Sequence, residues 1–422
     1  MEYTLHYIWK YRLYNAANLT TTDGKSLEII DPGIANTDAG PDFFNAKVKI
    51  DGTLWAGSIE IHDKASDWIK HGHQSDKAYN NVILHVVATD DKTIYRYNKE
   101  PIPQMVLSIP EKVISNIEWL ASRELPIPCL ERIPSINHIY QTQWLDVLLT
   151  ERLERKTNDI LKWLDQYATD WNEVFYILLC RNFGFGINSD AFERLARSLP
   201  LKCIQKQRQS ISQIEAMFLG QAGLLNEPYQ DQHHYYHFLQ QEYQFLQKKY
   251  GLTALEPHIF KNLRLRPNAT PHVKLAQLAA IWSQQDTLFS SILSARTPRE
   301  IKDFFRVNAS QFWDTHYNFR HSSPSRKKQL GVNALNILLI NSVVPVMFAY
   351  GTYHRMEEYK ERALRLLECI PPEQNSIISL FQRGGIQPRN AGDTQALIQL
   401  KRVYCEQKKC LYCRWGYQLL KQ

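Results

Sequence analysis

Two acidic side chains in the first part of the chain have the surroundings expected of a metal-binding pair. Asp42 follows a Gly-Pro pair, and Glu60 lies in the segment GSIEIH, beyond a tight turn. Two carboxylates that converge repel each other unless a cation lies between them. Mg²⁺ takes oxygen ligands from one or two carboxylates, and water and substrate phosphate complete its shell. We therefore expect Asp42 and Glu60 to bind Mg²⁺ or Mn²⁺ next to a phosphate group.

His62 lies two residues after Glu60. Side chains two positions apart on a strand project from the same face, so the two should be neighbours. Imidazole titrates near neutral pH and can act as a general base. We expect His62 to orient or deprotonate the attacking water, with Lys47, Lys49 or Lys64 as sources of positive charge.

Histidines are concentrated in the same region. Four of the 14 histidines lie between positions 62 and 85, at His62, His71, His73 and His85. With His73, Asp76 and Tyr79 on one helix face, the stretch would form a polar pocket that contacts a metal or a scissile phosphate. One alternative is a dedicated His/Asp site for zinc, manganese or iron, since neutral imidazole suits these ions. The other is structural, with histidines that only cap or hydrogen-bond a buried turn.

Cysteines form a second candidate metal site. Cys405, Cys410 and Cys413 have the spacing C-x4-C-x2-C, which lets three thiolates converge on one ion. The leading candidate for a fourth ligand is Cys369, and the others are Cys203, Cys180, Cys129 and a histidine. The bound group would be Zn²⁺ or a [4Fe–4S] cluster. The alternative is three reduced cysteines packed in a helical tail.

Basic residues in two regions are candidates for binding nucleic acid. The first region is a proline-containing loop that enters a helix, where an anion would meet unpaired amide groups. The second is the C-terminal segment, where bases alternate with tyrosine and tryptophan and could contact phosphates and stack on nucleobases. The residues concerned are Arg264, Arg266, Lys274, Arg402, Lys408 and Lys409. The simpler interpretation of both regions is a solvated helix face.

The elements that must position the acidic pair are strands. Segments with the period of strands run from position 24 to about 110, and they are SLEII, FFNAKVKI, TLWAGSIEIH, NNVILHVVA, TIYRY and PQMVLSI. Asp51-Gly52 tolerates positive φ and predicts a hairpin between the second and third segments. This hairpin would bring Asp42 and Glu60 together at one end of the sheet. Helices are expected over residues 2–14 and 66–79.

After the Pro-Ile-Pro sequence at 126–128 the period becomes that of helices. The sequence predicts an α+β chain with an α/β domain over 1–115, a helical domain over 116–365 and a helical C-terminal segment with the cysteines over 366–422. The apolar stretch 333–350 contains Asn336, Asn341 and Pro345 and is shorter than a bilayer crossing requires. We interpret it as a buried helix and expect no membrane span.

Charge is unevenly distributed along the chain. Residues 1–112 contain 12 Lys and Arg against 15 Asp and Glu, whereas the remainder contains 38 against 28. A basic body with a locally acidic segment suits a protein that binds a polyanion and a cation at separate places. Seven unevenly spaced cysteines and the absence of a leader-like start favour a reducing cytoplasm.

Glu2 on a helix, Pro41-Asp42 and Glu60-Ile61-His62 after a hairpin together resemble the PD-(D/E)xK nuclease superfamily, which includes restriction endonucleases and Holliday-junction resolvases. The resemblance covers about the first 110 residues. It implies a restriction-endonuclease-like mixed sheet with flanking helices, Mg²⁺ bound by the two acids, and an assisting role for Glu2. The superfamily has lysine where this chain has His62.

The whole chain resembles a bacterial family catalogued as domain of unknown function 2851. The phrases that match include AGPDFFNAKVKIDG, RLRPNATPHVKLAQLAA and NILLINSVVPVMFAYG. This resemblance implies no activity. From the residues themselves we expect a metal-dependent nuclease or a nuclease-derived nucleic-acid-binding protein. The alternatives are a non-catalytic scaffold with a degenerate nuclease-like domain and a hydrolase of another phosphorylated or small substrate.

Overall fold

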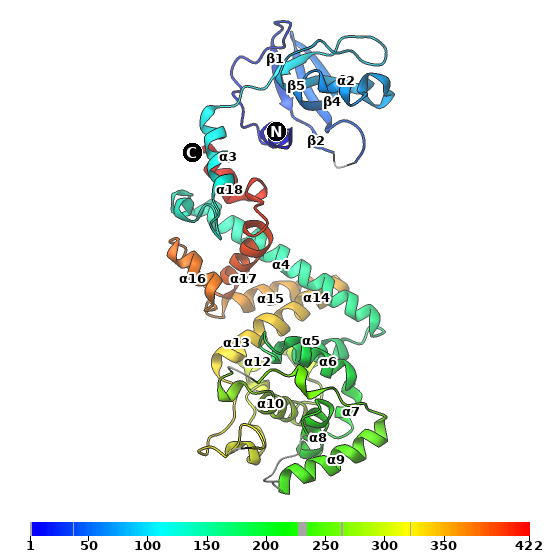
Figure 1. Cartoon of the computed structure of the whole chain (residues 1–422), viewed down its shortest axis with the longest axis vertical. Coiled ribbons are helices and arrows are strands. Elements are labelled where there is room, and N and C mark those ends of the chain that lie inside the picture. The colour runs from blue at the N-terminus through cyan, green and yellow to red at the C-terminus, as the bar shows by residue number, and fades with distance from the viewer. Residues whose placement is uncertain (1, 37, 227–233, 263–264, 321) are drawn as a thin grey trace. The chain divides into compact units, whose positions relative to one another are not determined.

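The computed structural model describes residues 2–36, 38–226, 234–262, 265–320 and 322–422. The chain divides into two compact units (Figure 1). The sheet unit comprises Met1–Gln141 together with Lys401–Gln422, and the helical unit comprises Thr142–Leu400. The chain is thus α+β, as expected. The C-terminal segment predicted over 366–422 is divided between the two units, because its last part returns to the sheet unit.

The sheet unit contains a mixed sheet with the order β1-β3-β4-β5-β6, and β2 pairs with β3. The strands are β1 (Leu27–Asp31), β2 (Ile34–Ala35), β3 (Phe43–Ile50), β4 (Thr53–Lys64), β5 (Val82–Thr89) and β6 (Gln104–Val106). β3 is antiparallel to β1 and β4, whereas β5 is parallel to β4 and β6. The predicted strand over TIYRY is absent from the described sheet, where Tyr95 forms only an isolated bridge to Pro101.

The β3–β4 hairpin has the predicted turn. Asp51 and Gly52 adopt positive φ values of 46° and 81°, and Ile50 pairs with Thr53 across the turn. At the other end of the hairpin Phe43 pairs with Ile59. Since Asp42 and Glu60 are the next residues outward, this register brings their backbones together.

The connection from β4 to β5 is not the single helix expected over 66–79. It consists of α2 (Asp67–Lys70), the 3₁₀ turn η1 (His73–Ser75) and the 3₁₀ turn η2 (Lys77–Asn81). Gly72 interrupts the helix with a φ of 79°, a conformation that L side chains rarely adopt. The broken path folds His71 and His73 back toward the sheet instead of spacing them along a helix face.

Helices complete the sheet unit. α1 (Glu2–Lys10) lies against β4 and is shorter than the predicted 2–14, since Arg12 already has a positive φ of 51°. α3 (Glu111–Ser122) and the 3₁₀ helix η3 (Leu130–Ser135) follow the sheet. The returning segment forms the end of the π-helix η8 (Leu400–Cys405), the 3₁₀ turn η9 (Cys410–Tyr412) and α18 (Arg414–Lys421).

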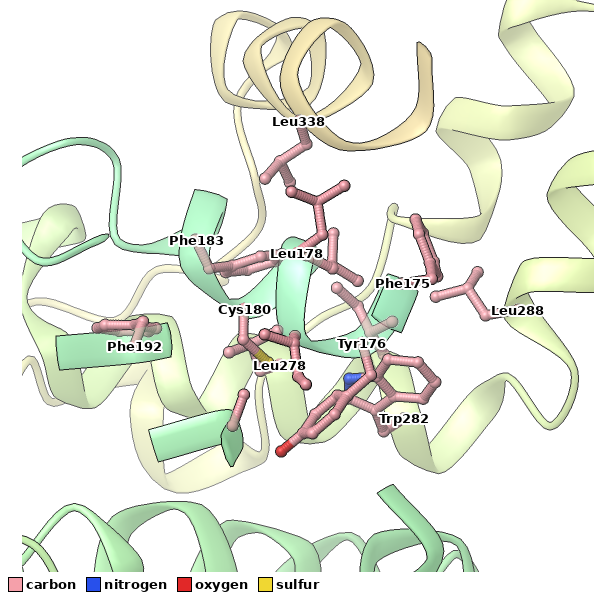
Figure 2. Packing of buried hydrophobic residues seen from close by; sticks show 14 of the residues in the cluster. Phe175, Tyr176, Leu178, Cys180, Phe183, Phe192, Leu278, Trp282, Leu288 and Leu338 are labelled. Atoms are coloured by element: carbon pink, nitrogen blue, oxygen red, sulfur yellow. The ribbon is translucent and has the colours of Figure 1, made fainter. Parts of the chain in front are cut away.

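The helical unit contains the longer part of the chain and a large apolar core. Its helices are α4 (His138–Gln166, entering from the sheet unit), α5 (Trp171–Phe183), α6 (Ser189–Ser198), α7 (Leu201–Gln205), α8 (Ile211–Gln221), α9 (His234–Tyr250), α10 (Pro271–Gln284), α11 (Leu288–Ser294), α12 (Pro298–Phe304), α13 (Val332–Leu338), α14 (Val344–His354), α15 (Glu357–Glu368), α16 (Ser376–Arg383) and α17 (Ala391–Gln399). Side chains of α5 pack against α10, α11 and α13 (Figure 2).

The apolar stretch of the sequence lies inside this core. The helical run Val332–His354 is long and apolar enough to cross a bilayer, yet 72% of its most apolar window is buried within the protein. Leu338, Val343 and Met347 belong to the same buried cluster as α5. This packing agrees with the interpretation of 333–350 as a buried helix.

Candidate functional site

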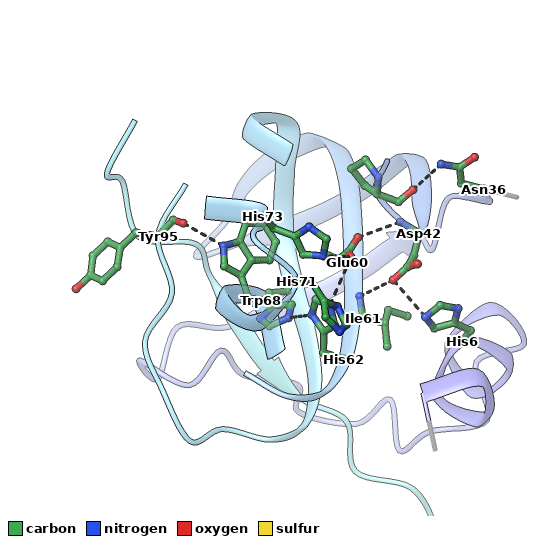
Figure 3. A network of polar contacts seen from close by, with 12 residues as sticks. His6, Asn36, Asp42, Glu60, Ile61, His62, Trp68, His71, His73 and Tyr95 are labelled. Atoms are coloured by element: carbon green, nitrogen blue, oxygen red, sulfur yellow. Dashed lines mark hydrogen bonds and ion pairs between the residues drawn. The ribbon is translucent and has the colours of Figure 1, made fainter. Parts of the chain in front are cut away.

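Asp42 and Glu60 lie together at the end of the β3–β4 hairpin, and each carboxylate is held by the backbone next to the other. The backbone N–H of Asp42 donates to Glu60 Oε2 at 3.1 Å, and the N–H of Ile61 donates to Asp42 Oδ2 at 2.9 Å (Figure 3). These two bonds fix both carboxylates relative to the sheet. The predicted convergence of the two acids is therefore present in the structure.

Glu60 is buried, with only 4% of its surface exposed. Burial raises the pKa of Glu60, and the negative charge of Asp42 adds to this effect, against the opposing hydrogen bond with His73. A buried carboxylate beside another acid is costly unless a cation or several hydrogen bonds compensate it. The oxygen that does not accept from the backbone, Oε1, faces His73.

His6 is a site residue that the sequence did not indicate. Its Nε2 lies 3.2 Å from Asp42 Oδ2. Burial alone would lower the pKa of His6, but the hydrogen bond to Asp42 and the charges of Asp42 and Glu2 outweigh it and raise the pKa. The charge of Glu2 thus contributes to the pKa of His6. The only signal in the sequence was the helical i, i+4 spacing of these two residues.

Three histidines face Glu60 from the opposite side (Figure 3). Ligand nitrogens of His62, His71 and His73 all lie within 4.8 Å of one another. His73 Nε2 and His62 Nε2 lie 3.2 and 3.7 Å from Glu60 Oε1. Three imidazoles and one carboxylate oxygen therefore converge on a common volume. This is a donor set typical of zinc, manganese or iron.

His85 lies behind His62 and determines how that ring can act. His62 Nδ1 is 2.8 Å from His85 Nε2, and His62 Nε2 is 3.1 Å from His71 Nδ1. If His62 donates its Nδ1 proton to His85, its Nε2 lone pair points toward His71 and Glu60. This lone pair can accept a hydrogen bond from His71 Nδ1 or bind a cation. A ligand histidine held through its second ring nitrogen is a common arrangement at metal sites.

Burial keeps the inner histidines neutral. It lowers the pKa of His62 to about 4, with the neighbouring charges of His73 and His71 contributing. It lowers the pKa of His85 to about 3, with smaller contributions from His62 and His73. Neutral imidazole is the form that binds metal ions. Both rings are therefore in their ligating form at neutral pH.

The family of the chain follows from a comparison with family models. Residues 2–376 match the model described as "Protein of unknown function (DUF2851)". The chain belongs to the DUF2851 family. Comparisons with curated proteins and with solved structures give no match. The residues matched include the whole acidic and histidine site, so the site is part of the DUF2851 region.

Two further predicted residues of this DUF2851 protein have different placements. Tyr79 stacks on His73 with ring centroids 3.9 Å apart, and burial together with the charges of Glu60 and Asp42 raises its pKa to about 12. Its hydroxyl is thus protonated at neutral pH. Asp76 is exposed and caps η2 by accepting the N–H of Ala78 at 2.8 Å. The structure therefore shows a local capping contact for Asp76.

Exposure in the DUF2851 site increases outward from the sheet. His62 is 1% exposed, His73 is partly buried and His71 is exposed. The three lysines proposed from the sequence are all exposed. Lys64 follows His62 on the same strand face, and Lys47 and Lys49 pair with Ala56 and Leu54, which share the face of Glu60. Positive charge thus lies on the same face of the sheet as Glu60 and His62.

The predicted nucleic-acid-binding residues divide into three groups. Arg264 lies outside the described residues. Arg266, Arg402, Lys408 and Lys409 are exposed and remain predictions. Lys274 corrects the expectation of a surface contact, because it is only 8% exposed and its Nζ donates to Gln277 Oε1 at 3.1 Å. Its helix, α10, is buried on nearly every side, so Lys274 ends in the interior.

The predicted cysteine ligands belong to both units. Cys405, Cys410 and Cys413 lie in the returning segment of the sheet unit, and the nearby thiol that interacts electrostatically with them is Cys129. Cys369 follows α15 in the helical unit and is exposed. The sequence indicated Cys369 as the leading candidate for a fourth ligand, whereas in the structure the thiol that interacts with the other three is that of Cys129.

Proposed function

We propose that the sheet unit is a metal-dependent phosphodiester hydrolase that acts on nucleic acid. The observation that supports this most directly is the convergence of Asp42 and Glu60, with three imidazoles facing the inner carboxylate. The order of elements, a helix followed by an antiparallel hairpin and a crossover to a parallel strand, also agrees with the resemblance to PD-(D/E)xK nucleases.

Glu60, His62, His71 and His73 would hold the metal ion. Because imidazole nitrogens make up most of this set, the site suits Mn²⁺ or another transition metal better than Mg²⁺, which prefers oxygen ligands. We therefore favour Mn²⁺ over Mg²⁺. When bound, such an ion stabilises negative charge on phosphate and lowers the pKa of water.

The remaining residues would act on water and phosphate. Asp42 is partly exposed and one of its oxygens is held by Ile61 and His6, so its other oxygen can orient a water molecule. His6 fixes the direction of that carboxylate. Tyr79 keeps its proton at neutral pH and can donate a hydrogen bond to a phosphate oxygen. Lys47, Lys49 and Lys64 would attract the polyanion.

The test is a cleavage assay on circular and linear DNA and on RNA with Mn²⁺, Mg²⁺ or EDTA. We expect cleavage with Mn²⁺ that EDTA abolishes and that a double variant, Asp42→Asn with Glu60→Gln, does not show. Glu28→Gln is a matched control, because Glu28 is an exposed carboxylate in β1 of the same sheet. Its cleavage should equal that of the wild type.

Two results would reject a hydrolase. Salt-sensitive binding of nucleic acid without cleavage under any metal would favour the nuclease-derived binding protein. The absence of both binding and cleavage would reject the nucleic-acid proposal and favour a scaffold. Equal cleavage by the wild type and the double variant would point to a contaminating nuclease.

A further inference from the structure

Four cysteines of the sheet unit are brought together from two distant parts of the chain. Cys129 directly precedes η3, and Cys405, Cys410 and Cys413 lie in the returning segment. The thiol of Cys129 interacts electrostatically with Cys413 and Cys410, and that of Cys405 interacts with Cys413, Cys129 and Cys410. The four side chains therefore form one cluster.

The returning segment folds tightly so that its own three thiols converge. Lys408 has a positive φ of 52° and donates its N–H to the carbonyl of Cys405 at 3.1 Å. The N–H of Cys413 donates to the carbonyl of Cys410 at 3.2 Å. Gly416 packs so closely on this turn that an added Cβ would lie 2.1 Å from the carbonyl oxygen of Cys410. Only glycine fits there, so the turn is closely defined.

A hydrogen-bond network ties the segment of Cys129 to α18. The N–H of Arg132 donates to the carbonyl of Cys129 at 2.9 Å, and the guanidinium of Arg132 donates to Asn116 Oδ1 at 2.9 Å. Asn116 Nδ2 in turn donates to the carbonyl of Leu419 in α18 at 3.1 Å. Since Cys413 caps the start of α18, this network keeps it near Cys129.

The chemistry of the cluster favours a bound cation. All seven cysteines are reduced, so no disulfide accounts for the grouping. Metal ions bind cysteine in its thiolate form, and grouped thiols can lose their protons to one bound metal centre. Cys180 offers a contrast, since it is buried in the apolar core of the helical unit.

We propose that Cys129, Cys405, Cys410 and Cys413 form a four-thiolate metal centre that clips the returning segment to the sheet unit. Four thiolates bind either one Zn²⁺ at about 2.3 Å or an iron–sulfur cluster. Among the described residues, the set of ligand atoms found within 4.8 Å of one another is the histidine set and not the thiols. This wider spacing favours a cluster, in which each thiolate binds a different iron.

The first test is metal content and visible absorbance of the full chain purified without oxygen. We expect about one centre per chain. Iron with sulfide and brown absorbance would identify a cluster, whereas stoichiometric zinc in a colourless protein would identify a single ion. Cys129→Ser and Cys413→Ser should each lose most of the metal. Cys369→Ser and Cys203→Ser are matched controls from the helical unit and should keep it.

A second measurement uses the wild type, so that a variant that fails to fold does not decide the matter. We expect a thiol reagent to modify the exposed Cys369 at once, and Cys129, Cys405, Cys410 and Cys413 only after a chelator removes the metal. Protein without zinc or iron overturns the proposal. So does metal that persists in Cys129→Ser or is lost in Cys369→Ser. These results are independent of nucleic-acid cleavage.

Discussion

Each unit contains a glutamate buried inside it, and the two carboxylates have different partners. Glu60 is 4% exposed in the sheet unit, and Glu215 is fully buried in the helical unit. Burial raises the pKa of both groups. Burial and a shifted pKa therefore do not distinguish them, and the atoms around each carboxylate must be compared.

Glu215 is surrounded by neutral donors. Its Oε2 accepts hydrogen bonds from Tyr235 Oη at 2.6 Å, Trp313 Nε1 at 3.0 Å and Ser310 Oγ at 3.1 Å. Its Oε1 accepts the N–H of Ser310 at 3.4 Å. These donors satisfy the carboxylate without any ion, and they join α8 to the segment around η6 (Gln311–Asp314). The role of Glu215 is structural.

Glu60 has partners that change with protonation or repel it. Its Oε1 faces the imidazoles of His73 and His62, and its neighbour Asp42 is a second acid. Within the part of the chain that the structure describes, the backbone N–H of Asp42 is the only fixed neutral donor to Glu60. The comparison teaches that a buried carboxylate indicates a site when its surroundings lack fixed donors and instead supply further metal ligands.

The substitution Glu60→Gln should have the largest effect, and this effect is on the rate of cleavage. We expect the rate to fall by about a thousandfold, or about 4 kcal/mol, because the amide cannot replace a charged ligand. The free energy of unfolding should change by less than about 1 kcal/mol, since the repulsion with Asp42 is also removed. Initial rates with Mn²⁺ and urea unfolding measure the two effects. A large loss of stability with an unchanged cleavage rate would show that Glu60, like Glu215, has a structural role.

Glu215→Gln should give the opposite result. Glutamine retains one oxygen, which can take the place of Oε2, but its amide N–H group then faces the N–H of Ser310, which donates to Oε1 in the native protein. We expect a loss of about 3 kcal/mol of stability. The midpoint of urea unfolding should fall, while cleavage by the folded protein stays at the wild-type rate. Reduced cleavage at full stability would contradict the structural role.

His85→Leu should weaken metal binding without removing a ligand. If His62 binds the metal through Nε2, its Nδ1–H donates to His85 Nε2, and leucine cannot accept that hydrogen bond. Loss of such a supporting contact typically lowers metal affinity ten- to a hundredfold, and we expect this for Mn²⁺ measured by calorimetry. His85→Gln offers an acceptor oxygen and is the control that should recover part of the affinity. Unchanged affinity in His85→Leu would show that His62 needs no such support.

Glu173 is intermediate between Glu60 and Glu215, and its substitution should have the smallest effect. Burial raises its pKa to about 7, and a single backbone donor, the N–H of Leu201, bonds both of its oxygens. From pH 4.5 to about 7 the unfolded chain releases the proton while the folded chain retains it. The contribution of Glu173 to the free energy of unfolding is therefore fully present below pH 4.5 and is lost as the pH rises through this window.

We expect this loss to be on the order of 1 to 2 kcal/mol, since solvent reaches part of the Glu173 side chain. Glu173→Gln should remove this pH-dependent loss of stability. Urea unfolding of the wild type and of Glu173→Gln at pH 5 and pH 7.5 would show the difference. An equal pH dependence in the wild type and Glu173→Gln would assign the effect to other groups.

Local patterns in the sequence predicted the hairpin and the pairing of Asp42 with Glu60, because Asp51-Gly52 and strand alternation determine both over short distances. The prediction of a single helix over 66–79 was wrong, because Gly72 redirects the chain. His6 was missed, since its contact with Asp42 depends on how α1 docks on the sheet.

Other errors arose from contacts between segments far apart in the sequence. Lys274 belongs to a helix that is buried almost all round, which its charge did not suggest. The grouping of Cys129 with the C-terminal cysteines could not be predicted, because distance along the chain says nothing about a segment that returns. Such contacts depend on tertiary packing, and local periodicity does not encode them.

The return of the chain to the sheet unit has a consequence for biosynthesis. A ribosome supplies the whole of Thr142–Leu400 before it supplies Lys401–Gln422. Until then Asn116 lacks the carbonyl of Leu419, and Ser135 lacks the side chain of Gln422. The strands of the nascent sheet can pair early, but the surface around α3 stays exposed until the final segment has been synthesised. Translational pausing within the helical unit would lengthen that exposure and give chaperones their longest opportunity to bind.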